Sequence, residues 1–166
     1  FVTVAVLARL LEPADYGSAA VAVALATFAP TVGDMGMGAA LVQTDRATRR
    51  VQSTAFWGSL AFGVSISALF VVFAGPVGQF LDDPRIGTMV AVGALTFAIY
   101  SLGSTSHATF MRAMNFRTIE LRFMLALVVA GVLSIIAAAS GLGAWALVLQ
   151  QVILITTFVA ALWWRA

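Results

Sequence analysis

Polar side chains recur at helical spacing inside a long apolar stretch near the start of the sequence. Thr27, Thr31, Asp34 and Gly38 are separated by steps of four, three and four positions, which places them on one face of a helix. An acid at the centre of a membrane-spanning helix costs about 2.5–3.5 kcal/mol on insertion scales, so Asp34 should face protein or a wet cavity instead of lipid. The alternative is that Asp34 lies near a membrane interface and is hydrated there.

A second apolar stretch carries a similar polar face. Thr96, Tyr100, Ser104, His107 and Met111 follow one another at steps of four, four, three and four, and such a face has little reason to lie against lipid. It is either the wall of a cavity or a set of interhelical hydrogen bonds. His107, near the end of the stretch, is either a hydrated interfacial histidine or a proton-coupling residue. The candidate cavity residues are therefore Asp34, Thr31, Tyr100, Ser104 and His107.

Arginines gather directly after this second stretch. Arg112, Arg117 and Arg122 lie within eleven residues of sequence, RAMNFRTIELR. The simplest interpretation is that they anchor the membrane topology. The alternative is a site for the phosphate of a lipid head group, because a guanidinium pairs with phosphate through two parallel hydrogen bonds.

The sequence carries none of the motifs of common enzymes. It has no P-loop and no hydrolase, kinase or metalloprotease pattern, so it shows no sign of ATP hydrolysis. With no Cys and a single His, neither a disulfide framework nor a metal cluster is expected. The sequence predicts no catalytic residue, no metal site, no cofactor and no enzymatic activity.

Composition places the chain in a membrane. Of its 166 residues 61% are hydrophobic and 10% charged, and the mean hydropathy is +1.02, values that ordinary soluble domains do not reach. All nine basic residues are arginines. They lie between apolar runs, where membrane topology requires them, and therefore do not indicate nucleic-acid binding.

Hydropathy and turn signals divide the chain into about six membrane-spanning helices, the first of them incomplete, in an all-α polytopic bundle. The polar segment Glu12 to Gly17 is expected to be a turn, Pro30 to kink the helix that follows, and Ser140 to Gly143 to reverse the chain. The stretch Leu11 to Gln43 is expected to organise the rest. The predicted helices cover residues 1–11, 18–43, 53–80, 87–111, 119–139 and 144–164.

The arginines also predict an orientation. The gaps after the second, fourth and sixth helices hold seven arginines, whereas the gaps after the first, third and fifth hold Arg9 and Arg85. The positive-inside rule then makes the first set of gaps cytoplasmic. The sequence starts without Met inside an apolar segment and ends directly after another, so we expect a fragment of a longer chain.

Five phrases of the sequence resemble those of a known family: LARLLEPADYG, GDMGMGAALVQ, STAFWGSL, FMRAMNFR and GLGAWALVLQQ. In this order they resemble bacterial Wzx-like polysaccharide transporters, or lipopolysaccharide-biosynthesis flippases, of the multidrug/oligosaccharidyl-lipid/polysaccharide exporter superfamily. The resemblance implies a MATE-like fold of two six-helix bundles around a cavity that opens alternately to either side, of which this chain would be most of the first bundle. It also implies the bacterial inner membrane as the location.

The function that the resemblance implies is movement of undecaprenyl-pyrophosphate-linked oligosaccharide, a unit of O-antigen, capsule or exopolysaccharide, from the cytoplasmic to the periplasmic leaflet. Implied partners are this lipid-linked substrate, membrane lipids, and polysaccharide polymerase and export proteins, but no nucleic acid. Two rivals stay open: an ion-coupled multidrug or cation exporter of the same superfamily, and a non-transporting assembly protein of polysaccharide synthesis. The candidate head-group residues are Arg9, Arg112 and Arg117, which lie inside the matching phrases, and Arg122.

Overall fold

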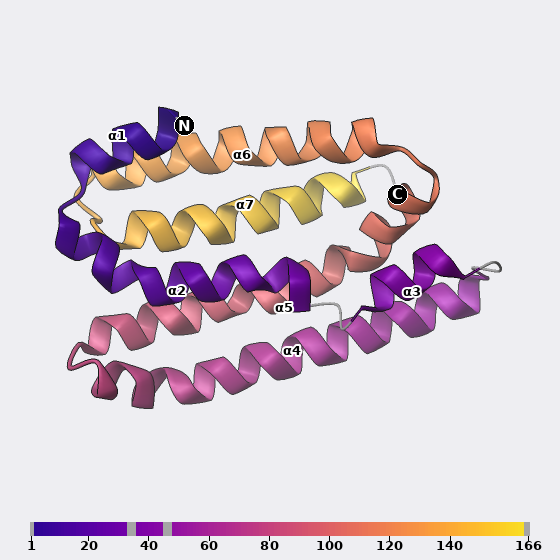
Figure 1. Ribbon diagram of the computed structural model, residues 1–166, viewed down its shortest axis with the longest axis horizontal. Helices are drawn as coiled ribbons and strands as arrows, with labels where there is room; N and C mark the ends of the chain where they lie inside the picture. Colours follow the sequence, from indigo (N-terminus) through magenta and orange to yellow (C-terminus); the bar gives the residue numbers. More distant parts are fainter. Residues whose placement is uncertain (1, 33–35, 45–47, 165–166) are drawn as a thin grey trace.

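The computed structural model describes residues 2–32, 36–44 and 48–164. Long helices run side by side along one axis, and no strand occurs in the described ranges (Figure 1). The helices are α1 Val2–Leu10, α2 Pro13–Val32, α3 Met37–Gln43, α4 Arg49–Phe80, α5 Pro84–Arg112, α6 Phe116–Ala139 and α7 Trp145–Trp163.

Five runs are long and apolar enough to cross a membrane: Pro13–Gln43, Arg49–Phe80, Pro84–Arg112, Phe116–Ala139 and Trp145–Trp163. The first of them contains α2 and α3. α1 has nine residues, about half of what a span needs. The expected all-α polytopic membrane fold is thereby confirmed.

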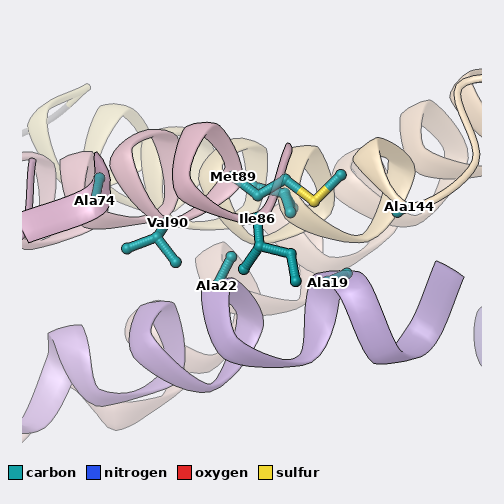
Figure 2. Packing of buried hydrophobic residues seen from close by; sticks show 8 residues of the cluster. Ala19, Ala22, Ala74, Ile86, Met89, Val90 and Ala144 are labelled. Atoms are coloured by element: carbon teal, nitrogen blue, oxygen red, sulfur yellow. The ribbon is translucent and has the colours of Figure 1, made fainter. Parts of the chain in front are cut away.

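The helix at the centre of the bundle is α5. It packs against α2, α3, α4, α6 and α7, and half of its most apolar window is buried. The expectation that Leu11 to Gln43 organises the chain was therefore wrong, because the side chains of α5 are small enough for neighbours to approach from several sides. In Figure 2, Ile86 of α5 points towards Ala19 and Ala22 of α2.

Glycines of α4 and α5 bring helix backbones into direct contact. A Cβ on Gly87 would lie 2.5 Å from the carbonyl oxygen of Ala74, and one on Gly63 would lie 2.8 Å from that of Phe97. Ala22 of α2 meets Gly93 of α5 in the same way. Small residues are the usual means by which membrane helices approach closely, because they remove the side chains that would hold the backbones apart.

The second predicted helix differs from the observed structure at both ends. α2 begins at Pro13, so most of the expected turn from Glu12 to Gly17 is helical. Pro13 occupies the first helical position, where no N–H is needed, and the Asp15 carboxylate accepts the N–H of Glu12 at 3.2 Å, as in a capping box. α2 continues through Pro30 to Val32, and α3 begins after Gly36, whose φ is 74°.

Three later helices also start earlier than hydropathy predicts, at residues 49, 84 and 116 instead of 53, 87 and 119. Each follows a capping residue. The side chain of each capping residue accepts a hydrogen bond from a backbone N–H of the new helix. The pairs are Thr48 with Val51, Asp83 with Arg85, and Asn115 with Thr118. Such caps satisfy the first free N–H groups and let a helix begin in polar sequence.

The reversal predicted at Ser140 to Gly143 is confirmed. Gly141 has a φ of 84°, the N–H of Leu142 donates to the carbonyl of Ala137, and the N–H of Gly141 donates to that of Ala138. This is a Schellman motif. The α4–α5 and α5–α6 turns repeat it with Asp82 and Met114 in the left-handed conformation, at φ 54° and 55°. The α1–α2, α4–α5 and α6–α7 turns share one end of the bundle (Figure 1).

Candidate functional site

A pocket of about 300 Å³ opens where four helices meet, in the half of the bundle nearer the α5–α6 turn. Two of the predicted cavity residues, Tyr100 and His107, line it from α5. They lie seven positions apart, two helical turns, so one helix face presents both. The pocket's full lining is Pro30 of α2, Tyr100 and His107 of α5, Ile119, Glu120 and Phe123 of α6, and Leu154, Ile155 and Phe158 of α7.

Aromatic rings form much of the wall. The ring of His107 meets that of Phe158 edge to face, with centroids 5.9 Å apart, and Phe158 meets Phe123 in the same manner at 5.6 Å. These contacts have the favourable geometry for aromatic pairs, and they hold the imidazole against α7, whose Phe158 packs in turn on Phe123 of α6. The pocket therefore combines apolar and aromatic surface with a few polar groups, the usual composition of a ligand site.

The acid of this pocket was missed by sequence reasoning. Glu120 lies in the first turns of α6 and lines the pocket together with His107. Hydropathy predicts a connection up to residue 118 and a helix over 119–139, so Glu120 lies at a predicted helix end, where the sequence gives it no partner. One feature of the sequence could have indicated its role: Glu120 and Phe123 are three positions apart, which places both on one face of a helix.

The other predicted cavity residues do not line this pocket. Ser104 is buried and donates to the carbonyl of Ser101 at 3.0 Å, and Thr96 donates to that of Gly93 at 2.6 Å. Both hydroxyls thus donate within α5, and not to another helix as one of the two alternatives for this polar face predicted. Thr31 is exposed near the end of α2, next to Pro30. Asp34 lies outside the described residues.

The four candidate head-group arginines do not form one cluster. Arg9 is exposed at the end of α1, at the opposite end of the bundle from the α5–α6 turn. Arg117 is exposed in α6. Arg122 is half-buried: it donates to the carbonyl of Leu162 at 3.2 Å, and its guanidinium lies 4.4 Å from the centre of the Phe110 ring. Arg122 therefore ties α5, α6 and α7 together.

Arg112 extends from the last turn of α5 to the end of α3. Its guanidinium donates to the carbonyl of Leu41 at 3.3 Å and to the carbonyl of Thr44. It also lines a second pocket, of about 360 Å³, together with Gln52 of α4 and Thr109 of α5. Of the four candidate head-group arginines, Arg112 is the one whose side chain lines a pocket described here.

Comparisons with known proteins relate the chain to polysaccharide biosynthesis proteins. Residues 6–166 match the family model described as "Polysaccharide biosynthesis protein". The chain is 30% identical over 150 residues to the succinoglycan biosynthesis transport protein ExoT of Rhizobium meliloti (strain 1021), covering 90% of this chain and 30% of that protein. No solved structure matches the chain.

Two further relatives match shorter parts of the chain. The teichuronic acid biosynthesis protein TuaB of Bacillus subtilis (strain 168) is 32% identical over 93 residues, which are 56% of this chain and 19% of TuaB. The lipopolysaccharide biosynthesis protein WzxC of Escherichia coli (strain K12) is 20% identical over 118 residues, 71% of this chain and 24% of WzxC. The chain thus spans less than a third of the length of these relatives. The resemblance to Wzx-like transporters is confirmed, and the chain belongs to the polysaccharide biosynthesis protein family.

Proposed function

We propose that the protein containing this chain is a flippase, and not an enzyme, which moves undecaprenyl-pyrophosphate-linked oligosaccharide from the cytoplasmic to the periplasmic leaflet of the bacterial inner membrane. The observation that carries the proposal is the pocket of Tyr100, His107 and Glu120, which places three polar groups among apolar helices of a family that includes a succinoglycan transport protein and WzxC. Polar groups at such a place usually mark a substrate path.

The physical need for such a pocket follows from the substrate. Sugar hydroxyls and pyrophosphate charges lose their water in hydrocarbon, at a cost of several kcal/mol per unpaired group. A groove lined by the hydroxyl of Tyr100, the imidazole of His107 and the carboxylate of Glu120 offers replacement hydrogen bonds to sugars, while aromatic faces cover their apolar sides. The polyprenyl tail stays outside in the lipid.

The arginine-rich end of the bundle then faces the cytoplasm, where the lipid-linked unit is loaded. The transport cycle is alternating access between this bundle and a second one, with the substrate held between them. Polysaccharide polymerase and export proteins receive the delivered unit. Orientation, driving force and partners all belong to the proposal.

The test uses the full-length gene in cells that lack their own flippase. We expect labelled lipid-linked oligosaccharide to reach the periplasmic face, and Glu120→Gln to reduce delivery by about 10–100-fold, because hydrogen bonds to a charged group contribute about 1.5–3 kcal/mol. Tyr100→Phe should reduce delivery by about 2–10-fold. Thr156→Ala is the control, since Thr156 is exposed on α7 outside the pocket and bonds to its own helix. Trapping of the substrate despite normal expression would overturn the proposal.

One rival function has an observation in its favour. An acid and an imidazole in one pocket, Glu120 and His107, would also suit an ion-coupled exporter of organic cations, for which aromatic rings provide additional attraction. If lipid-linked sugars stay trapped, drug-efflux assays on the same variants decide between the two. Efflux that depends on Glu120 but not on Thr156 would establish the exporter.

A further inference from the structure

The short helix α3 depends on its neighbours for stability. It has seven residues, too few to be stable in isolation. It lies against α4 and α5 (Figure 1). Its apolar contact is the small cluster of Leu41, Ala55 of α4 and Ala108 of α5, with Met37 packed beside it.

Arg112 supplies the polar part of this docking. Its guanidinium reaches from α5 to the carbonyls of Leu41 and Thr44, at the end of α3. Free carbonyls at a helix end carry partial negative charge, so a cation there stabilises the helix. The same residue therefore fastens α3 to α5.

The Arg112 side chain also borders the pocket of about 360 Å³ that contains Gln52 and Thr109. A phosphoryl group in this pocket would meet the guanidinium, the Gln52 amide and the Thr109 hydroxyl. A guanidinium and a phosphate form two parallel hydrogen bonds in which both partners are charged, whereas the bonds of Arg112 to the Leu41 and Thr44 carbonyls have a neutral acceptor. An anion there would also be repelled by the carbonyl oxygens of Leu41 and Thr44, since both carry partial negative charge.

We propose that this pocket is a phosphoryl-binding site that acts as a latch: an anion bound there draws Arg112 away from the carbonyls of Leu41 and Thr44, and α3 leaves its place on α4 and α5. The inference rests on the proposed function, because the pyrophosphate of the lipid-linked unit is the anion that loading would bring to this end. The anion can shift α3 because it binds Arg112 better once the carbonyls have been released.

A buried alanine beneath α3 offers a direct readout. Ala55 is 6% exposed and packs against Leu41, outside the Arg112 pocket. In cysteine-free full-length protein in detergent, an Ala55→Cys thiol should react slowly with a water-soluble maleimide. Saturating inorganic pyrophosphate should raise its reaction rate about tenfold, a change that requires only ~1.4 kcal/mol of differential binding. Ala74→Cys, 5% exposed on the same helix but under α5 at the other end, is the matched control and should not respond.

Arginine variants test whether the effect passes through Arg112. With Arg112→Gln, Ala55→Cys should react fast with or without pyrophosphate. Arg112→Lys keeps a donor for the α3 carbonyls but not the two-pronged phosphate contact, so its basal rate should stay low and its response should fall at least about threefold. Arg117→Gln, an exposed arginine at the same end, should behave like the parent.

Two membrane conditions separate the sources of the phosphoryl group. A response to pyrophosphate in detergent shows that a free anion suffices, whereas a response only in nanodiscs containing phosphatidylglycerol, and not in phosphatidylcholine alone, assigns the site to lipid phosphate. An Ala55→Cys rate that neither condition changes, or a rise that persists in Arg112→Gln, overturns the latch. Delivery of lipid-linked sugar in the cell assay would survive that result, so failure of the latch and failure of the proposed function are distinguishable.

Discussion

At the scale of single residues, close helix contact in this bundle depends on glycines, which have no side chain to hold two backbones apart. Gly87 of α5 lies against the backbone of α4, where a Cβ would be 2.5 Å from the Ala74 carbonyl oxygen. The atom that the Cβ would meet belongs to the backbone, so it cannot move away by a change of rotamer as the end of a flexible side chain could. By contrast, a Cβ on Gly17, inside α2, would have nothing within 4 Å.

We therefore expect opposite effects from the same substitution at these two glycines. Gly87→Ala should lower the free energy of unfolding by about 1–3 kcal/mol, because the helices must separate to admit the methyl group. Gly17→Ala should raise it by about 0.5–1 kcal/mol, since alanine loses less backbone entropy in a helix. Unfolding of the full-length protein by titration with sodium dodecyl sulfate measures both. Equal stability of the two variants would contradict the close contact.

At the scale of elements, the helices are ended and restarted by local hydrogen bonds. The α5–α6 turn shows the pattern: α5 closes with Met114 in the left-handed conformation, and the Asn115 side chain then accepts the N–H of Thr118 to start α6. A non-glycine residue in the left-handed region costs about 1–2 kcal/mol. Met114 is 78% exposed, so packing of its side chain does not offset that cost.

Met114→Gly is accordingly expected to raise the free energy of unfolding by about 1 kcal/mol, because glycine adopts the left-handed conformation without strain. Met111→Gly, inside the last turn of the same helix, should instead lower it by about 0.5–1 kcal/mol. The same detergent titration compares the two. If Met114→Gly proved as harmful as Met111→Gly, the turn would not have the geometry described.

At the scale of the whole molecule, charge separates along the bundle. Glu12, Asp15, Asp82 and Asp83 lie at or beside the α1–α2 and α4–α5 turns at one end, whereas Arg112 and Arg117 flank the α5–α6 turn at the other. Positive charge collects on the cytoplasmic side of membrane proteins. In the proposed orientation the α5–α6 turn therefore faces the cytoplasm.

Accessibility in intact cells tests this orientation. A membrane-impermeant thiol reagent should label Leu142→Cys, in the α6–α7 turn, without treatment, and should label Met114→Cys only after the inner membrane has been opened. Leu142 is 45% exposed and Met114 is 78% exposed, so burial would not account for a difference in labelling between the two positions. The opposite pattern would invert the proposed orientation, and labelling of both in intact cells would contradict the topology.

The sequence predicted what depends on local pattern. Hydropathy located the apolar runs, glycines located the α6–α7 reversal, and helical spacing placed Tyr100 and His107 on one face that lines a pocket. It did not predict contacts between distant segments. Glu120 joins that pocket from another helix, and Arg122 binds a carbonyl 40 positions away. Such pairings depend on how helices pack, and no spacing along one helix encodes them.

The turns also bear on how the protein is made. In the α4–α5 turn every backbone hydrogen bond described joins groups at most five positions apart, as from the N–H of Asp83 to the carbonyl of Gly78. The α5–α6 and α6–α7 turns are built alike. Each turn can therefore close as soon as its own residues have left the ribosome, before later helices exist. Because α4 and α5 are neighbours in sequence and pack extensively, they can enter the bilayer as a finished hairpin, against which α6 and α7 assemble when their synthesis is complete.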